Sequence, residues 1–418
     1  MKGNSIRFLL IVSALVLVLS ISALSVTTIV FWHAYSETSG EVNLLMKTII
    51  PDFEQLYPNI KVDAQLVPYD TMYQKLIVGV RSGVLPDVAR MDIIWVPQFA
   101  NAGILMPLNE QQFPGFDALK TQFYPGPLST NFWKGSYYGL PLDTNTQVLC
   151  WNAKDFQEAG IQGPPKTMDE FINDIKLLTK KDASGKTIQW GYADGGVDVW
   201  NTLPWIYSMG GSILSPGSTT SQGYINSPAS VKALQTYAQL YEGGYIAPWS
   251  GGPGTFEGLA QGTYAMTISG PWIVSILAGE YPNFKVNFAL FPAGSGGSRS
   301  VTGGEDIVMF KNTKHPDAAW TFMKYMLSDK VQTEFAQLDQ MSAIAHLASN
   351  PDYFKTNPYY AIYTQQLETA VARPPVPAYT KIDSILTNLW EAACTSGMPA
   401  QAALDSAAQQ INQALAQQ

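Results

Sequence analysis

Flat aromatic rings next to chain turns are the first candidates for a binding site. A β-prone run has to end at Gly270 and Pro271, so Trp272 is presented at a strand end. Trp200 and Asp198 lie at the start of a predicted helix. An indole can cover the C–H face of a ring, and a carboxylate accepts strong hydrogen bonds from hydroxyl groups. These residues predict a site for a sugar-sized polar ligand, although burial in a core would explain Trp272 equally well.

Polar side chains at other predicted strand ends add to these candidates. Asp92 closes a short strand, where the alternative is a turn residue or a helix N-cap. Asp143 and Asn145 alternate along a later strand and so share one face, and the alternative is an exposed strand face. Arg373 precedes two prolines and is either a donor in a cleft or a solvated cation at a helix end. Carboxylates and amides of this kind suit the hydroxyl groups of a ligand.

Motifs for catalysis, phosphate binding or metal binding are missing from the sequence. No G-x-S-x-G or H-E-x-x-H run occurs. The GKT run at 185–187 has Lys180 where a phosphate loop needs a glycine, so it predicts a reverse turn. The three histidines, His33, His315 and His346, lack metal-ligand spacing, and no cofactor is expected. A glycoside hydrolase is the rival class, because it also needs an acidic pair and aromatic subsites.

Composition limits the class of protein. The chain has 418 residues, enough for two or three domains with large cores. Its net charge is −8 and its Lys and Arg residues form no cluster, which argues against nucleic acid as a partner. Aromatic residues reach 12% and charged residues only 14%, which suits carbohydrate contact and also suits ordinary large cores. The two cysteines, Cys150 and Cys394, lie in apolar segments and are expected to be separate buried thiols.

Residues 1–26 have the layout of a secretory signal peptide. Lys2 and Arg7 form a cationic start, residues 8–19 are apolar, and residues 20–25 are mostly small. The alternative is an uncleaved membrane anchor, because the weakly polar run continues far enough to span a bilayer. No cysteine directly follows that could accept a lipid. We therefore expect an exported protein, in the periplasm or at the cell surface.

The elements that must position the candidate residues alternate between strand and helix. A β-branched and aromatic run at 27–32 predicts a buried strand, and a helix at 41–56 follows it. A second strand at 60–67 and a helix at 71–80 repeat the pattern, which is typical of an α/β fold with a parallel sheet. Further elements are expected at 168–179 (a helix capped by Thr167), 301–310 (a strand) and 353–372 (a helix).

Three stretches resemble a known family. AMTISGPW at 265–272 and PDVARMDIIWVPQFANAGILMPL at 86–108 resemble the matching runs of maltose- and trehalose-type extracellular solute-binding proteins (family 1) of ABC importers. In that family the tryptophan stacks on a sugar ring and the strand-end aspartate meets sugar hydroxyls. VTGGEDIVMF at 301–310 resembles the family's returning strand, whose paired glycines bring backbone close to the ligand. Many relatives have an aromatic residue where Glu305 stands, so this wall is expected to form hydrogen bonds instead of stacking.

The resemblance implies a two-lobed α/β fold of the type II periplasmic-binding-protein class. Each lobe would contain a mixed, mostly parallel sheet flanked by helices, and a hinge would join the lobes. The expected division is a signal peptide at 1–26, an N-terminal lobe at 27–142 and 301–337, and a C-terminal lobe at 143–300 and 338–418. The cleft between the lobes would hold the ligand.

The implied function is that of an extracytoplasmic receptor. It would bind a di- or oligosaccharide, such as maltose or trehalose, and deliver it to the permease subunits of an ABC importer. The protein is expected to act as a monomer that closes on its ligand, without catalysis. A receptor for glycerol-3-phosphate or a glycerophosphodiester is the alternative, and a glycoside hydrolase is less favoured. The residues expected to bind the ligand are Tyr35, Glu37, Asp92, Asp143, Asn145, Asp198, Trp200, Trp272, Gly303, Gly304, Glu305 and Arg373.

Overall fold

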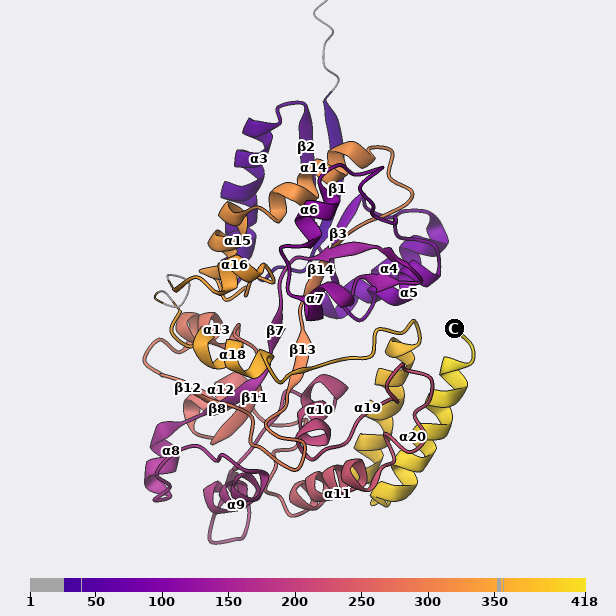
Figure 1. Cartoon of the computed structure of the whole chain (residues 1–418). Coiled ribbons are helices and arrows are strands. Elements are labelled where there is room, and N and C mark those ends of the chain that lie inside the picture. The colour runs from indigo at the N-terminus through magenta and orange to yellow at the C-terminus, as the bar shows by residue number, and fades with distance from the viewer. Residues whose placement is uncertain (1–25, 39, 352–354, 356) are drawn as a thin grey trace, which may run out of the picture.

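The computed structural model describes residues 26–38, 40–351, 355 and 357–418. Two lobes, one above the other in Figure 1, are joined in the middle by short strands. The predicted signal peptide lies outside the described residues, apart from Val26. Among the residues that are described, no helix has the length and apolar character needed to cross a membrane.

The N-terminal lobe is built on a five-stranded sheet in the order β2-β1-β3-β14-β6. β1 is parallel to β2 and β3, as the strand and helix pattern predicts, while β14 is antiparallel to β3 and β6. β3 is buried along its whole length, because helices cover both faces of this sheet. The strands are β1 (Thr27–His33), β2 (Ile60–Leu66), β3 (Val88–Asp92), β6 (Gly139–Pro141) and β14 (Glu305–Met309), with a separate hairpin of β4 (Phe132–Trp133) and β5 (Ser136–Tyr137).

Helices from the first part of the chain and from residues 316–348 pack on this sheet. The helix expected at 41–56 is one continuous helical stretch with a π-helical middle. Phe53 from this stretch and Phe322 from a much later helix meet edge to face, with ring centroids 5.2 Å apart. The helical segments are α2 (Glu41–Leu44), η1 (Leu45–Ile49), α3 (Ile50–Leu56), α4 (Tyr69–Ser82), α5 (Val96–Asn101), α6 (Phe116–Lys120), α7 (Pro125–Ser129), α14 (Pro316–Met326), α15 (Asp329–Ala336) and α16 (Ala345–Ala348).

The C-terminal lobe has a smaller central sheet, in which β8 pairs antiparallel with β11 on one side and β12 on the other. Parallel bridges join Trp190 to Tyr264 and Tyr192 to Ile246 beside it. The ladders of this sheet are antiparallel, and only the isolated bridges beside it are parallel. The mostly parallel sheet expected for this lobe is therefore not found among the described residues. The strands are β8 (Val148–Trp151), β11 (Met266–Ser269) and β12 (Asn287–Ala289), with a hairpin of β9 (Lys180–Lys181) and β10 (Thr187–Gln189).

Helices surround this second sheet. Thr167 caps its helix, as expected, in a capping box with Glu170. Cys150 and Cys394 are both buried and unpaired, which confirms the expected separate thiols. The helices are α8 (Ala153–Glu158), α9 (Met168–Leu178), α10 (Val199–Ser208), α11 (Pro228–Glu242), α12 (Thr255–Gln261), α13 (Ile273–Glu280), α18 (Tyr360–Leu367), α19 (Tyr379–Thr395) and α20 (Ala400–Leu415).

A three-stranded sheet lies where the lobes join: β7 (Asn145–Thr146), β13 (Val301–Gly303) and β15 (Val371–Ala372). The strand expected at 301–310 is split, because Gly304 has a φ of +134° and lets the chain leave β13 and enter β14 of the N-terminal sheet. The helix expected at 353–372 is shorter than expected, because α18 covers only Tyr360–Leu367 and residues 371–372 form β15, which pairs with β13. Positions 353, 354 and 356 of the expected helix lie outside the described residues.

The segments after residue 337 bear on where the chain makes its third passage between the lobes. Ile344 and Leu347 pack in the N-terminal core, whereas Tyr360 and Tyr363 pack with Val148 of the C-terminal lobe. We therefore propose that the chain crosses between α16 and α18, and not at residue 337.

Candidate ligand-binding site

A cavity of about 540 Å³ lies between the lobes, with walls from both lobes and from the crossing strands. Its volume is within the usual range for small-molecule sites. All but three of the predicted site residues line it. The residues brought together are Asp92, Asn145, Asp198, Trp200, Trp272, Gly303, Gly304, Glu305 and Arg373.

Two half-exposed tryptophans form the aromatic wall of the cavity. Trp272 follows β11, and a Cβ on Gly270 would lie only 2.0 Å from its ring, so glycine is required for the indole to fold over the strand end. Trp200 is in the first turn of α10, whose N-cap Asp198 accepts a hydrogen bond from the Asn201 N–H at 2.9 Å. The two indole centroids are 6.5 Å apart and the rings are inclined by 32°.

The Trp200 indole is held from behind by the chain that crosses between the lobes. With its amide oxygen turned toward the indole, Gln147 accepts the Trp200 Nε1–H at 2.7 Å. Gly303 lies against the same ring: a Cβ there would be 2.4 Å from it. Gly303 thus makes room for side chains of the cavity wall and Gly304 for the backbone at Asp143 and Thr144, a role beyond the expected close approach of backbone to ligand.

Asp92 and Arg373 form an ion pair in the cavity wall. The Arg373 Nη2 lies 3.2 Å from the Asp92 Oδ1, and both side chains are almost fully buried. Asp92 also accepts hydrogen bonds from the Tyr69 hydroxyl and from the Ile94 N–H. The Arg373 guanidinium lies over the Trp200 ring, 5.0 Å from its centroid. The charge of Arg373 is therefore balanced within the protein.

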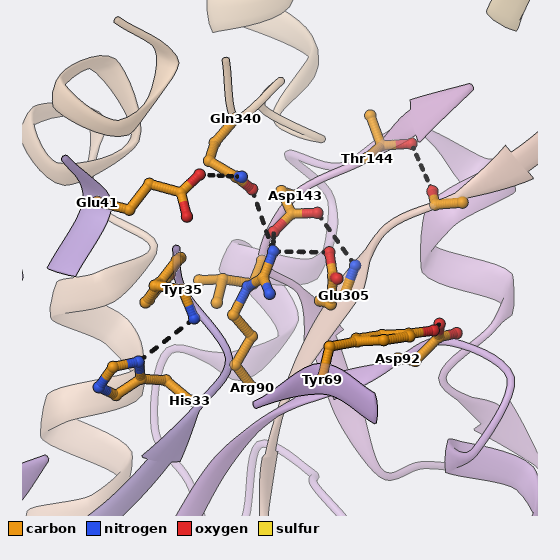
Figure 2. A network of polar contacts seen from close by, with 12 residues as sticks. His33, Tyr35, Glu41, Tyr69, Arg90, Asp92, Asp143, Thr144, Glu305 and Gln340 are labelled. Carbon is orange, nitrogen blue, oxygen red and sulfur yellow. Dashed lines mark hydrogen bonds and ion pairs between the residues drawn. The ribbon is translucent and has the colours of Figure 1, made fainter. Parts of the chain in front are cut away.

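A second buried arginine, Arg90, organises the adjoining part of the same wall (Figure 2). Its Nη2 lies 2.8 Å from Glu305 Oε2, 3.1 Å from Asp143 Oδ2 and 3.2 Å from Gln340 Oε1. Gln340 in turn donates to Glu41 at 2.6 Å. Sequence reasoning missed Arg90, although one signal pointed to it: it lies two residues before Asp92 on the same strand and so faces the same way.

Three predicted residues do not reach the cavity. Tyr35 is 3% exposed and stacks on Phe335, with ring centroids 4.7 Å apart. Asp143 is 4% exposed and accepts the backbone N–H of Glu305 at 3.1 Å, so it supports the wall from behind. Glu37 is exposed in the loop after β1. The further lining residues that the sequence did not indicate are Ala34, Ser36, Glu41, Tyr69, Arg90, Ile94, Ile276, Gln340 and Asp383.

Acidic groups outnumber basic groups in the cavity wall. Burial raises the pKa of Glu305 well above its usual range, although the Arg90 guanidinium opposes the shift. Burial also raises the pKa of Asp383 to about 6, and raises the pKa of Glu41 and of Asp198. A protonated carboxyl can donate a hydrogen bond as well as accept one, which suits hydroxyl groups. In the described part of the chain no group of three or more His, Cys, Asp or Glu side chains could hold a metal ion.

A two-lobed α/β protein with a polar, tryptophan-walled cavity at its hinge has the architecture of a solute-binding protein. The model of the family described as bacterial extracellular solute-binding protein matches residues 38–333. The chain belongs to this family, and the family assignment confirms the expected export of the protein from the cytoplasm.

Relatives and solved structures agree with this assignment. A putative binding protein of Brucella abortus is 26% identical over 84% of this chain and 85% of its own length. The sn-glycerol-3-phosphate-binding periplasmic protein of Yersinia pestis is 24% identical over 97% of this chain and 96% of its own. An ABC transporter solute-binding protein of Thermotoga lettingae, bound with α-D-tagatose, has a TM-score of 0.80 and 26% identity and covers 93% of this chain and 100% of that chain. The predicted fold class is confirmed.

Proposed function

We propose that the protein binds an uncharged carbohydrate in the interlobe cavity and delivers it to the permease subunits of an ABC importer. The observation that carries this proposal is the pairing of two half-exposed tryptophans with several carboxyls around one cavity, while both cavity arginines are already engaged in ion pairs. The indoles would cover the C–H faces of a sugar ring. The carboxyls and Asn145 would pair with its hydroxyl groups.

The proposed contacts are sufficient for useful affinity. A hydrogen bond to a charged group contributes about 1.5–3 kcal/mol. A few such bonds together with stacking reach micromolar binding, which requires about −8 kcal/mol. Of the predicted residues, we propose Asp92, Asn145, Asp198, Trp200, Trp272, Gly303, Gly304, Glu305 and Arg373 as the ligand-binding set. Tyr35 and Asp143 do not line the cavity and instead support the residues that do.

Glycerol-3-phosphate, which the Yersinia pestis relative binds by its name, is the second candidate ligand. The charges of the cavity argue against it. A phosphate needs cationic partners, and here Arg90 and Arg373 are both occupied by carboxylates of the protein. Three further carboxyls, those of Glu41, Asp198 and Asp383, line the same cavity. An anionic ligand would therefore meet a surplus of acidic groups.

We further propose that the protein does not catalyse a reaction. A glycosidase needs one carboxyl as a general acid and another as a base or nucleophile. Asp92 is held by Arg373 and Tyr69, and Glu305 is held by Arg90, so two of the cavity carboxyls are committed to ion pairs. Release of reducing ends from maltose, trehalose or longer oligosaccharides during incubation with the protein would overturn this proposal.

We place the mature protein in the periplasm or at the cell surface, with residues 1–26 as a cleaved export signal. Cell fractionation and mass determination of the N-terminus of the exported protein test this placement. A mature protein that retains residues 1–26 would favour the membrane anchor instead.

A thermal-shift screen identifies the ligand class. The panel contains tagatose, maltose, trehalose, a maltodextrin series and glycerol-3-phosphate. We expect at least one neutral saccharide to stabilise the protein and glycerol-3-phosphate to have no effect. A ligand at 100 times its dissociation constant stabilises by about 2.7 kcal/mol, which is readily measured.

Trp272→Ala is the matched control for the screen, because it removes the cavity indole without touching an ion pair. It should abolish the shift produced by the saccharide. A shift with glycerol-3-phosphate alone would replace our proposal by the second candidate.

A further inference from the structure

Arg90 lies at the point where the N-terminal sheet meets the hinge. It is in the middle of β3, and only 7% of the residue is exposed. Its guanidinium lies over the ring of Tyr35, 4.7 Å from the centroid. A charge buried to this extent is tolerated only where partners surround it. The role of the Arg90 side chain can therefore be inferred from the residues that it contacts.

The partners of Arg90 come from three separate segments at the junction of the lobes. Asp143 immediately precedes the segment that crosses as β7, and Glu305 follows directly after the glycine pair at the end of β13. Gln340 adjoins Met341, whose carbonyl oxygen accepts the N–H of Thr144 at 2.8 Å. Figure 2 shows these side chains converging on one guanidinium. One nitrogen atom of β3 thus contacts each of the three segments.

The three contacts of this nitrogen differ in kind. Nη2 of Arg90 carries two hydrogen atoms, and its hydrogen bonds go to Asp143 and Gln340. Glu305 is held by the charge of Arg90, and its Oε2 has no hydrogen-bond partner among the described residues. Glu305 and Gln340 both line the cavity, whereas Asp143 does not reach it. A ligand hydroxyl that donates to Glu305 Oε2 would therefore satisfy this oxygen and leave both hydrogen bonds of Nη2 in place.

We propose that Arg90 is a positioning residue that couples the ligand contact at Glu305 to the segments that join the lobes. It does not need to touch the ligand itself. Because one guanidinium holds both Glu305 and the segments at the lobe junction, the position of a ligand bound at Glu305 is tied to the orientation of the lobes. The ligand contact at Glu305 rests on the proposed function, but the anchoring of the hinge by Arg90 does not.

The first experiment measures the distance between the lobes. Gln111 and Gln162 are both exposed, one in each lobe, and each is replaced by cysteine to carry a spin label. The two native cysteines are buried, so the labels attach selectively to the introduced ones. Arg90→Lys keeps the charge but replaces the planar fork by a single ammonium group. We expect this variant to broaden the distance distribution measured by electron–electron resonance, without any ligand present. A distribution equal to that of the otherwise unchanged labelled protein would overturn the proposal.

Asp306→Asn is the matched control for the distance measurement. Asp306 is fully buried and adjacent to Glu305, but its partners Thr130 and Asn131 both belong to the N-terminal lobe. We expect this variant to change thermal stability and to leave the distance distribution as it is. The same broadening in both variants would mean that loss of stability alone loosens the hinge, and would overturn the assignment to Arg90.

The second experiment tests the coupling to the ligand by a double-mutant cycle. Arg90→Lys and Glu305→Gln should each weaken binding of the stabilising saccharide by about tenfold in calorimetric titration. If Arg90 acts through Glu305, the double variant should bind within about twofold of the weaker single variant. Additive losses would show that the two residues act independently.

A third variant covers the case in which Arg90→Lys does not fold. Gln340→Ala removes one neutral anchor and leaves every ion pair of Arg90 in place, and it should broaden the distance distribution to a smaller extent. An unchanged distribution in this variant would count against the proposal. If no saccharide binds the unaltered protein, the proposed function fails, whereas the distance measurement still decides whether Arg90 anchors the hinge.

Discussion

The space beside Gly303 is filled by side chains of the cavity wall, so even one methyl group there has consequences. A Cβ at this position would lie 2.4 Å from the Trp200 ring and 2.3 Å from the Asn145 Oδ1. We expect Gly303→Ala to displace Trp200 and to weaken saccharide binding by at least about tenfold, or about 1.4 kcal/mol. Calorimetric titration with the stabilising saccharide measures the loss.

Gly279→Ala is the control for this substitution. Gly279 lies in α13, and a Cβ there would meet nothing within 4 Å. Alanine in a helix is more stable than glycine by roughly 0.5–1 kcal/mol, so this variant should be slightly stabilised and bind normally. Equal affinity of both variants would remove Trp200 from the proposed ligand contacts.

Individual site residues were predictable where their placement depends on local chain geometry. Trp272 follows a Gly-Pro turn and Asp198 caps a helix, and both signals lie within a few residues of the side chain. The position of Tyr35 could not be predicted in this way, because its stacking partner Phe335 is 300 residues away in the sequence. Arg90 was missed for the same reason: its partners belong to segments that only the tertiary fold brings together.

At the level of elements, a buried carboxyl links α11 to the loop ahead of α10. Asp194 accepts hydrogen bonds from the Tyr237 hydroxyl at 2.5 Å and from the Trp249 indole at 3.1 Å. Burial raises the pKa of Asp194 to about 7. The folded protein therefore holds this proton over a range in which the unfolded chain has lost it. The contribution of Asp194 to the free energy of unfolding therefore falls as the pH rises from about 4 toward 7, and levels off above that range.

Replacement of this carboxyl should flatten the pH profile. Between pH 5 and pH 7.5 the unaltered protein should lose about 2–3 kcal/mol more of its unfolding free energy than Asp194→Asn does. Urea denaturation at the two pH values measures the difference. Parallel losses in the two proteins would show that Asp194 titrates near its ordinary value in the folded state.

Periodicity located most elements, and it failed where a partner strand decides the conformation. The strand and helix alternation after β1 and the cap at Thr167 are local patterns, and both were predicted. The split of the 301–310 strand was not, because it depends on Gly304 passing from one sheet to another. The short β15 was assigned to a helix, since two residues gain strand geometry only from pairing with Val301 and Thr302.

At the level of the whole molecule, the lobes also touch directly between α5 and α19. The Thr380 hydroxyl of α19 donates to the side chain of Gln98 on α5 at 2.9 Å. One hydrogen bond contributes about 1 kcal/mol, which is about a fivefold change in an equilibrium. Thr380→Val should therefore shift the lobes toward more open orientations and weaken ligand binding by up to about fivefold. Small-angle scattering without added saccharide measures the opening as a larger radius of gyration.

Thr387→Val is the control for Thr380→Val, because it makes the same substitution on the same helix, α19. Within the described residues the Thr387 hydroxyl is buried and has no hydrogen-bond partner, so its loss should be neutral or stabilising. The radius of gyration of this variant should equal that of the unaltered protein. Equal values in both variants would show that the contact of Thr380 with Gln98 does not hold the lobes together.

The two-lobed fold was accessible from the sequence through family resemblance, whereas the third crossing that we propose between α16 and α18 was not. Local patterns show where a helix ends, but not which core it joins. α16 packs with the N-terminal lobe because Ile344 and Leu347 find their neighbours there, and no short-range signal marks that choice.

The place of β14 between β3 and β6 also has a consequence for how the protein is made. This interior strand of the first sheet is contributed by residues that leave the ribosome only after most of the second lobe has been synthesised. Until Met309 has emerged, β3 has an open edge, and the first half of the polypeptide cannot complete its fold. A secreted precursor benefits from that delay, because translocation can begin while the nascent chain is still unfolded.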